Sequence, residues 1–461
     1  MSSPQPRPAD GTEPLTRGQR LDRLPFTRQH GRLLGGSGVG WALDAMDVGL
    51  ISFVIAALTA QWGLGDLERS LLGSVGFAGM AVGATLGGLL ADRVGRRQVF
   101  ALTLLVYGAA TGASALVGGL AALLALRFVV GLGLGAELPV ASTLVSEYAP
   151  ARLRGRVVVA LEAFWAVGWT AAALIGFFVV GASDDGWRWA FALGAVPALY
   201  AVVVRRGLPE SVRFLEGRGR GDEAEAAVRR FERSAGVETP STADARRTRE
   251  DRAPVRAGLR DLWDAGLRRR TAALWAVWFC VNFSYYGAFI WLPSLLVDAG
   301  YPLVRSFEYT LLITLAQLPG YAAAAVLVER WGRRPVLATF LVGSAVGALL
   351  LGQAGSATTI VLAGMLLSFF NLGAWGALYA VTPEVYGTAL RGTGAGAAAG
   401  FGRLASILAP LSVVPLTALG GTVAVFTAFG LVFVVAAAAC WGLPELRGRA
   451  LEESVRERVD A

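Results

Sequence analysis

Residues Gly87–Arg97 read GGLLADRVGRR, an apolar, glycine-rich run that stops at Asp92, turns at Gly95 and continues with two arginines. The same order of an acid, a glycine and two arginines returns in ERWGRR at Glu329–Arg334. Glu329 follows Asp92 after 237 residues. A single short match of this kind would carry no weight, but it sets an offset against which other matches can be compared.

Two further pairs of motifs repeat in the same order. The acidic and basic ends of Glu147–Arg154 recur in Glu384–Arg391, again after 237 residues. The tetrapeptide GLPE at Gly207–Glu210 recurs at Gly442–Glu445 after 235 residues. Three pairs at nearly one offset indicate that the chain contains two copies of one structural unit.

The composition is that of a membrane protein. Of the 461 residues, 54% are hydrophobic and only 16% are charged, and the mean hydropathy is +0.53. Apolar runs of about 20 residues, long enough to cross a bilayer core as helices, recur along most of the chain. They lack the period-2 alternation of a membrane barrel, and helices satisfy their own backbone hydrogen bonds in lipid. We therefore predict an all-α membrane protein surrounded by the lipid bilayer.

The basic residues gather in alternate loops. All of them are arginines, and the net charge is +8. They follow the second, fourth, eighth and tenth helices, which is a pattern of membrane orientation rather than of nucleic-acid binding. It predicts that both termini and the central loop are cytoplasmic. The twelve transmembrane helices are expected at 34–60, 70–91, 98–118, 120–146, 157–181, 187–205, 270–297, 306–328, 335–353, 357–381, 393–417 and 419–441.

The long polar stretches divide the chain. We expect a cytoplasmic tail at 1–32, a six-helix bundle at 33–206, a cytoplasmic central loop at 207–269, a second bundle at 270–442 and a cytoplasmic tail at 443–461. The N-terminal tail is predicted to be disordered and to contain no signal peptide. Within the central loop, Asp222–Arg233 has helical composition and Gly236–Pro254 has that of a linker.

The layout and the motifs resemble the major facilitator superfamily. Six helices, a polar loop and six more helices match its architecture, and Gly88–Arg97 resembles its signature between helices two and three. Three other stretches resemble the sugar-porter branch: Arg127–Gly135 followed by Glu147 and Arg154, Pro209–Leu215, and Pro444–Glu453. The resemblance covers nearly the whole chain. It implies two pseudo-symmetric six-helix bundles and a secondary transporter that works by alternating access.

Other stretches point to particular groups within that superfamily. Leu43–Asp47, reading LDAMD, is similar to the motif of aromatic-acid:proton symporters. Tyr379–Tyr386, followed by RGTG, resembles niacin transporters and synaptic-vesicle-protein-like members. The glutamine-rich segment of sugar porters is absent from helix seven, where Cys280–Tyr286 reads CVNFSYY, and Trp169 stands where helix five is expected to carry a glutamine. A sugar is therefore not the first choice of substrate.

Charged side chains inside spanning helices are costly, by roughly 2.5–3.5 kcal/mol each, so they are usually functional or paired. Asp44 and Asp47 are three residues apart and share one face of the first helix. The resemblance implies that Asp47 faces Arg127 and that proton binding breaks their pair. A permanent salt bridge that only joins two helices is the alternative. Glu162 is a candidate for a second proton site, for a substrate contact or for a partner of a loop arginine.

The substrate site is expected among aromatic faces with a few hydrogen-bonding groups, which suit a flat ring. Arg403, near the middle of its helix, is a candidate for binding a substrate carboxylate, and a partner for Glu384 is the alternative. Trp291 is expected in the aromatic belt at the membrane surface, and Trp41 is either cavity or core. The full set of predicted substrate residues is Trp165, Trp169, Asn282, Tyr285, Tyr286, Gln317, Asn371, Trp375, Tyr379 and Arg403.

The loop charges are expected to act as a cytoplasmic gate. Ion pairs among them would join the two halves when the outside is open and would break when the inside opens. Orientation in the membrane is a second role for the same residues. The predicted gate comprises Asp92, Arg96, Glu147, Arg154, Arg213, Glu329, Arg333, Glu384 and Arg391.

Together these features predict a proton-coupled importer of a small aromatic carboxylate, with nicotinate as the first choice. A sugar or polyol transporter, an organic-cation or drug exporter, and a receptor that no longer transports are the alternatives. An enzyme is not expected, because the only histidine is His30 in the tail and the sequence has no metal-ligand cluster. No cofactor is expected. The partners are a small-molecule substrate and protons, and the chain is expected to be a monomer.

Overall fold

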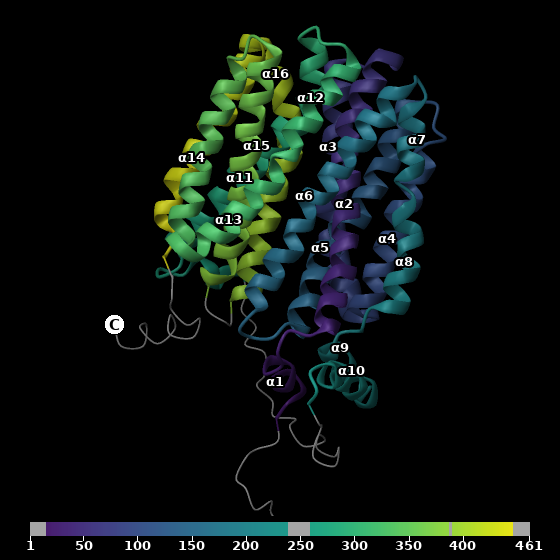
Figure 1. Cartoon of the computed structure of the whole chain (residues 1–461), viewed down its shortest axis with the longest axis vertical. Coiled ribbons are helices and arrows are strands. Elements are labelled where there is room, and N and C mark those ends of the chain that lie inside the picture. Colours follow the sequence, from purple (N-terminus) through teal and green to yellow (C-terminus); the bar gives the residue numbers. More distant parts are fainter. Residues whose placement is uncertain (1–14, 238–258, 387–389, 446–461) are drawn as a thin grey trace, which may run out of the picture.

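The computed structural model describes residues 15–237, 259–386 and 390–445. The side chains of Asp92 and Arg391 lie outside this description, as do most of the predicted linker Gly236–Pro254 and the C-terminal tail from residue 446. The described chain folds into two groups of long, roughly parallel helices that stand side by side (Figure 1). This arrangement confirms the predicted all-α fold with two bundles.

The first bundle contains the helices that precede the central loop. Their bounds are α2 Arg28–Trp62, α3 Asp66–Val94, α4 Arg96–Ser114, α5 Leu120–Tyr148, α6 Arg154–Phe178, α7 Gly186–Leu193 and α8 Val196–Gly207, with a short turn of helix, η1, at Val180–Ala182. The sixth predicted span, 187–205, thus forms two consecutive helices, α7 and α8. Pro197 lies in the first turn of α8, where its missing N–H costs no hydrogen bond.

The second bundle repeats this plan. Its helices are α11 Arg268–Asp298, α12 Leu303–Leu315, α13 Gln317–Trp331, α14 Arg333–Gly352, α15 Ala357–Val381 and α16 Arg391–Ala439, with short turns η2 Leu259–Trp263, η3 Thr382–Glu384 and η4 Cys440–Gly442. The backbone of α16 leaves helical geometry at Gly420 and Gly421, the latter with φ of 63°. This break falls at the start of the predicted twelfth helix, 419–441, a few residues after the predicted end of the eleventh at 417.

Ten segments of the described chain are long and apolar enough to cross a membrane. The last of them, Thr393–Gly442, has 50 residues and contains the break in α16. The 19-residue helix α4 is not among the ten. Counting the two parts of α16 separately and adding α4 gives twelve, but this count combines two criteria, so the number of twelve spans stays a prediction.

The repeated turn has the same structure in both bundles. Gly95 ends α3 with φ of 109°, and Gly332 ends α13 with φ of 101°. Only glycine adopts this region without strain. In each bundle the following backbone N–H groups bind the glutamate of the repeated GLPE motif. Arg97 donates to Glu210 at 3.0 Å, and Arg334 donates to Glu445 at 2.9 Å.

Glycines bring α3 and α5 into close contact. A Cβ atom at Gly131 would lie 2.0 Å from the carbonyl oxygen of Gly76, and one at Gly135 would lie 2.0 Å from that of Met80. Gly83 faces the backbone of Leu132 in the same way. Any larger residue would push the helices apart, so these glycines fix the packing that holds the buried charges of α5 in place.

The N-terminal tail was expected to be disordered up to Arg32, and its described part is ordered. Thr16 and Gln19 cap a short helix, α1 (Arg17–Asp22), and α2 already begins at Arg28. Arg20 forms ion pairs with Glu225 at 3.0 Å and with Glu232 at 2.7 Å. Both glutamates lie on α10 (Gly221–Ser234), which confirms the helix predicted at Asp222–Arg233. The order of the tail depends on ion pairs with α10, so the sequence of the tail alone could not predict it.

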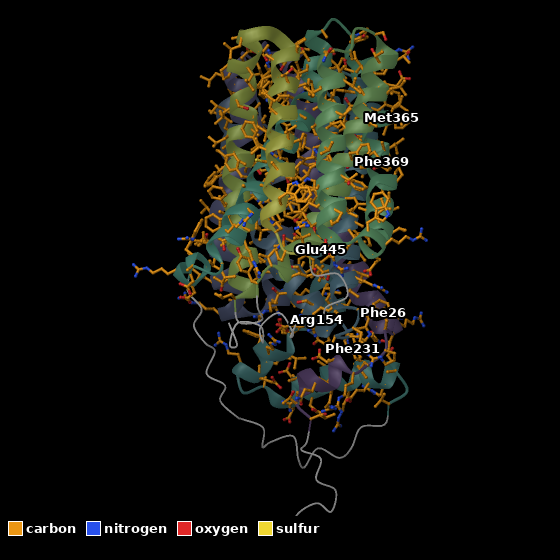
Figure 2. All side chains as sticks on the ribbon, turned by 90° about the vertical axis from the view of Figure 1, so that its left-hand side faces the viewer. Phe26, Arg154, Phe231, Met365, Phe369 and Glu445 are labelled. Carbon is orange, nitrogen blue, oxygen red and sulfur yellow. The ribbon has the colours of Figure 1, made fainter. Side chains whose placement is uncertain are left out.

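Aromatic contacts join the same region to the bundle. The His30 ring is 4.8 Å from Phe231 of α10, and its Nε2 is 3.0 Å from the carbonyl oxygen of Tyr148. Phe26 stacks on His30. α1, α9 (Val212–Gly217) and α10 thus form a small cap at one end of the molecule, where Figure 2 labels Phe26, Phe231 and Arg154. We call this end the α10 end.

The two bundles touch most firmly at the opposite end. Arg69 of α3 binds Asp298, the last residue of α11, at 2.8 Å, and its guanidinium lies 5.3 Å from the Trp291 ring. Phe53 of α2 meets Phe307 of α12 with ring centroids 5.1 Å apart. Trp291 is buried, so its prediction as an exposed belt residue is wrong, because Arg69 covers its face.

Candidate substrate cavity and buried charges

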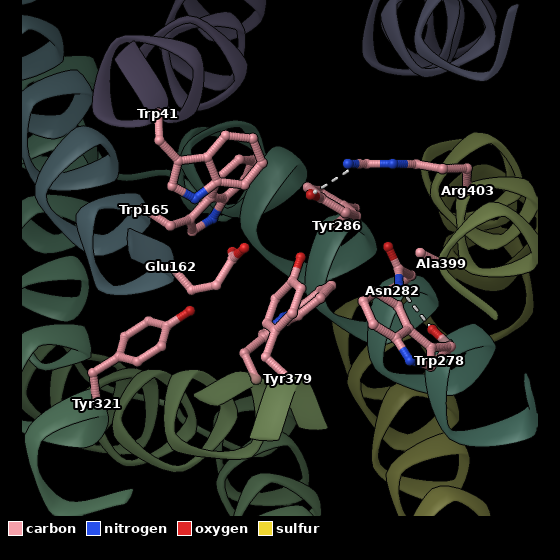
Figure 3. Close-up of a pocket in the computed structure, with 11 residues that line it drawn as sticks. Trp41, Glu162, Trp165, Trp278, Asn282, Tyr286, Tyr321, Tyr379, Ala399 and Arg403 are labelled. Atoms are coloured by element: carbon pink, nitrogen blue, oxygen red, sulfur yellow. Dashed lines mark hydrogen bonds between the residues drawn. The ribbon is translucent and has the colours of Figure 1, made fainter. Parts of the chain in front are cut away.

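A small cavity lies between the two bundles (Figure 3). The first bundle contributes side chains from α2 and α6, and the second contributes side chains from α11, α13, α15 and α16. Its walls are mainly aromatic. The lining residues are Trp41, Glu162, Trp165, Trp278, Asn282, Tyr286, Tyr321, Trp375, Tyr379, Ala399 and Arg403.

Six of the ten predicted substrate residues line this cavity: Trp165, Asn282, Tyr286, Trp375, Tyr379 and Arg403. The other four are buried and do not line it. Trp169 packs on Tyr285 with ring centroids 5.5 Å apart, and Tyr285 accepts a hydrogen bond from Trp165 at 3.3 Å. Gln317 and Asn371 are buried away from the lining. A role in binding stays a prediction for all ten.

Trp278, Tyr321 and Ala399 line the cavity although the sequence did not single them out. Trp278 lies one helical turn before Asn282 on α11 and therefore on the same face of the helix. This spacing could have identified Trp278 as a residue of the cavity. Its ring packs edge-on against those of Trp375 and Tyr379, with ring centroids 5.6 Å and 5.3 Å apart, respectively. No comparable signal marks Tyr321 or Ala399.

Two charged groups enter the cavity, one from each bundle. Figure 3 shows the Glu162 carboxyl beside Trp165 and Tyr379, with the Arg403 guanidinium reaching in on the other side of Tyr286. Arg403 donates one long hydrogen bond, 3.5 Å, to the Tyr286 hydroxyl. Arg403 acts on Glu162 through its charge, and the Trp41 and Tyr379 polar groups lie near the carboxyl. The cavity therefore offers a ligand one carboxyl group, from Glu162, and one permanent positive charge, from Arg403.

Asn282 is already engaged within the protein. Its amide nitrogen donates to the carbonyl oxygen of Trp278 at 2.7 Å, and its oxygen accepts from Ser406 at 3.0 Å. Trp278 in turn donates to Thr382 at 3.0 Å. These bonds fix the α11 side of the cavity and leave Asn282 little capacity for a hydroxyl-rich ligand.

A buried ion pair lies inside the first bundle. Arg127 of α5 donates to Asp47 of α2 at 2.9 Å, and Thr111 of α4 donates to the other oxygen of Asp47 at 2.6 Å. Both members of the pair are almost completely buried. The pair expected from the resemblance is present, while its part in proton coupling stays a prediction.

Asp44 occupies a separate buried cluster one turn earlier on α2. Its carboxyl interacts with Glu137 of α5 and with the Tyr107 hydroxyl of α4. All four carboxyl oxygens of the two acids are buried, and among the described residues none of them has a hydrogen bond of good geometry, although the Tyr107 hydroxyl lies near Asp44. A proton carried by one acid and donated to the other would satisfy this arrangement. Glu137 is thus a candidate proton site that the predicted set did not include.

Four of the described gate charges pair with each other within their own bundles. Arg96 lies 3.7 Å from Glu147 in the first, and Arg333 lies 3.2 Å from Glu384 in the second. Arg154 binds Asp22, and Arg213 is exposed near Glu147. Burial raises the pKa of Glu384, against the opposing effect of Arg333. Asp92 and Arg391 have side chains outside the description, so their pairing stays a prediction.

One described ion pair crosses between the bundles at the α10 end. Arg156 of α6 lies 3.7 Å from Glu329 of α13, and both side chains are exposed. Such a pair contributes about 0–1 kcal/mol. The bundles are thus held more tightly at the end opposite to α10, where Arg69 and Asp298 meet at 2.8 Å.

Comparison with known proteins agrees with this architecture. The model of the family described as "Sugar (and other) transporter" matches residues 52–457. The Niacin transporter NiaP of Acinetobacter baylyi is 48% identical over 435 residues, which cover 94% of this chain and 98% of that protein. The Synaptic vesicle 2-related protein of Bos taurus is 31% identical, with 94% of this chain and 82% of that protein covered.

Among solved structures, the xylose transporter XylE from E. coli in a partially occluded inward open conformation superimposes with a TM-score of 0.74. The match covers 91% of this chain and 99% of that one, at 20% identity. At this identity the likeness shows the fold. Together with the family match, it shows that the chain belongs to the sugar transporter family of the major facilitator superfamily and is a multi-pass membrane transporter of small molecules, not an enzyme.

Proposed function

We propose that this transporter imports nicotinate, a small aromatic carboxylate, across the cytoplasmic membrane together with protons. The aromatic cavity that receives Arg403 from one bundle and Glu162 from the other carries the proposal. The 48% identity to a niacin transporter over nearly the whole chain supports the same substrate.

The cavity suits a flat anion. Trp41 and Trp165 lie with their ring centroids 5.1 Å apart on one side, and Trp375 and Tyr379 stack at 5.7 Å on another. Such walls favour an aromatic ring. The Arg403 guanidinium presents several N–H donors in a fork that matches a carboxylate. We therefore assign Arg403 to the substrate carboxylate, with the aromatic side chains around the ring.

The same features weigh against the other substrates. An organic cation would approach Arg403 and would be repelled by its permanent charge. A sugar needs many hydrogen-bonding partners, whereas both polar ends of Asn282 are used within the protein. The aromatic walls offer few others.

Proton coupling is assigned to the buried acids of the first bundle. Protonation of Asp47 would weaken its bond to Arg127, so that α2 and α5 could shift relative to each other. Asp44, which interacts with Glu137, is close enough to Asp47 for their charges to interact. Proton binding at one acid is then coupled to the other.

We further propose that the α10 end faces the cytoplasm, because the arginine-rich loops lie there. On this assignment the contacts of Arg69 and Phe53 close the outer end, and inward opening requires loss of the weak pair Arg156–Glu329, the one ion pair between the bundles at this end among the described side chains. The predicted gate charges would meet across the bundles in the outward-open state. The bundles at 33–206 and 270–442 move as the two units, and the chain works as a monomer.

The substrate assignment can be tested by uptake of labelled nicotinate, glucose and a cationic dye into proteoliposomes. We expect uptake of nicotinate alone. Replacement of Arg403 by Ala removes a charged hydrogen bond of about 1.5–3 kcal/mol, so the KM for nicotinate should rise by roughly 10- to 150-fold. Arg403→Lys should recover part of the loss. Uptake of glucose or the dye in place of nicotinate would contradict the proposal.

A further inference from the structure

Among the described residues, Glu162 is the one acid that lines the cavity. It comes from α6 of the first bundle and is almost completely buried. The charge that acts on it is Arg403 from α16 of the second bundle, across the cavity, and that guanidinium bonds Tyr286 instead. Among the described residues no arginine forms a close ion pair with Glu162. A buried carboxyl in this position is costly unless a ligand completes its bonding.

A carboxyl group can bond a ring nitrogen in either protonation state. When Glu162 carries the proton, its O–H donates to the lone pair of the nitrogen. When the nitrogen carries the proton, its N–H donates to the carboxylate. A benzene ring of the same size offers neither interaction. The carboxyl therefore distinguishes two flat rings that the aromatic walls alone would accept equally.

The position of the two charges adds a second constraint. Glu162 and Arg403 enter from opposite bundles and point into the same space (Figure 3). A ligand that meets both must carry its carboxylate and its nitrogen at different edges of one ring. Both bundles then contact the same small molecule, which links its binding to their relative position.

We propose that Glu162 binds the ring nitrogen of the substrate while Arg403 binds its carboxylate, so that the transporter selects pyridine carboxylates over benzoate. This inference rests on the proposed nicotinate transport and assigns Glu162 to specificity rather than to the membrane proton pathway. Nicotinamide should also bind poorly, because its neutral amide cannot form an ion pair with Arg403.

The test is competition against labelled nicotinate in proteoliposomes, with unlabelled nicotinate, benzoate and nicotinamide as competitors. Loss of a buried hydrogen bond predicts that benzoate competes about 10- to 100-fold less well than nicotinate in the unaltered protein. In Glu162→Leu the difference between nicotinate and benzoate should disappear. Glu162→Gln should keep part of it, because an amide N–H still donates to a ring nitrogen.

The control is Glu223→Leu, the same change at an exposed glutamate of α10 that does not line the cavity. It should leave the ratio of nicotinate to benzoate unchanged. Equal competition by benzoate and nicotinate in the unaltered protein would overturn the inference even if the Glu162 variants do not fold. An unchanged ratio in a folded Glu162→Leu protein would overturn it as well. Absence of nicotinate uptake in the unaltered protein would instead refute the proposed function.

Discussion

Arg127 and Asp47 form the buried ion pair of this transporter, with the guanidinium 2.9 Å from the carboxylate and Thr111 bonded to the second carboxylate oxygen. The two residues belong to α5 and α2, and glycines seat α5 directly against α3. Breaking a buried pair by removing one partner typically costs 3–5 kcal/mol, so the helices are held in register as long as Asp47 is ionised. Protonation of Asp47 removes that constraint without removing an atom of the protein.

Replacement of Asp47 by Asn should therefore separate two activities. Gradient-driven accumulation of nicotinate should be lost, because no proton can bind at this position. Exchange of labelled for unlabelled nicotinate should persist, because the neutral side chain mimics the protonated state. The measurement is accumulation and exchange in the same proteoliposomes. Asp185→Asn, which alters an exposed acid, is the control, and full accumulation by Asp47→Asn would rule out a proton role for Asp47.

Closing the end opposite to α10 permanently should stop transport. Arg69 and Asp298 meet there across the two bundles. In a background where Cys280 and Cys440 are replaced by Ala, the double variant Arg69→Cys with Asp298→Cys should form a cross-link on oxidation and lose most of its uptake. Reduction should restore uptake. Cross-linked protein that transports at the normal rate would show that this end need not open.

The turn at Gly95 should not tolerate a side chain. A Cβ atom there would lie 2.6 Å from a Glu210 carboxylate oxygen, and the backbone has a positive φ of 109°. Gly95→Ala should lower the free energy of unfolding by more than about 1 kcal/mol. Gly35→Ala in α2 has no neighbour within 4 Å and should leave stability unchanged or slightly raise it. Thermal unfolding in detergent measures the stability of both variants. Equal unfolding midpoints for the two would contradict the predicted strain at position 95.

The contact between α1 and α10 should weaken in acid. Burial alone would raise the pKa of Glu225, but the hydrogen bonds and charges of Arg20, with Arg17 and Arg229, lower it below its ordinary value of 4.5. Because the pKa of Glu225 is lower in the folded state, its ionised carboxylate stabilises the contact above pH 4.5. The contact loses this stabilisation as the pH falls through the folded pKa.

Hydrogen exchange of residues 15–24, corrected for the intrinsic rate, measures this effect. Protection should be constant from about pH 7 to about pH 5 and should fall below that range. In Glu225→Gln the protection should be lower at neutral pH and should depend less on pH. The same acid-induced loss in both proteins would exclude Glu225 as its source.

Much of the fold could be predicted from the three repeated motifs, because residues of different motifs contact each other in the same way in both bundles. Gly95 meets Glu210, and Gly332 meets Glu445 in the other bundle. The N-terminal tail could not be predicted in this way, since α1 is held by Arg20 pairing with Glu225, more than two hundred residues away.

The charged residues of the candidate site could be predicted from the sequence, but its aromatic residues could be predicted only in part. Glu162 and Arg403 stand out because ionisable groups are rare in spanning helices. Aromatic residues are common there, and helices that are apolar all round do not reveal which face meets the cavity. Trp169 was therefore included although it packs against Tyr285, and Trp278 was missed although it lines the cavity.

Accumulation of labelled nicotinate in proteoliposomes, with and without an inward proton gradient, tests the central claim most directly. We predict that nicotinate reaches a higher concentration inside than outside only when the gradient is present, and that dissipating the gradient with an uncoupler releases the excess. Uptake that is indifferent to the gradient would contradict proton coupling. Absence of nicotinate uptake in either condition would contradict the assignment of the substrate.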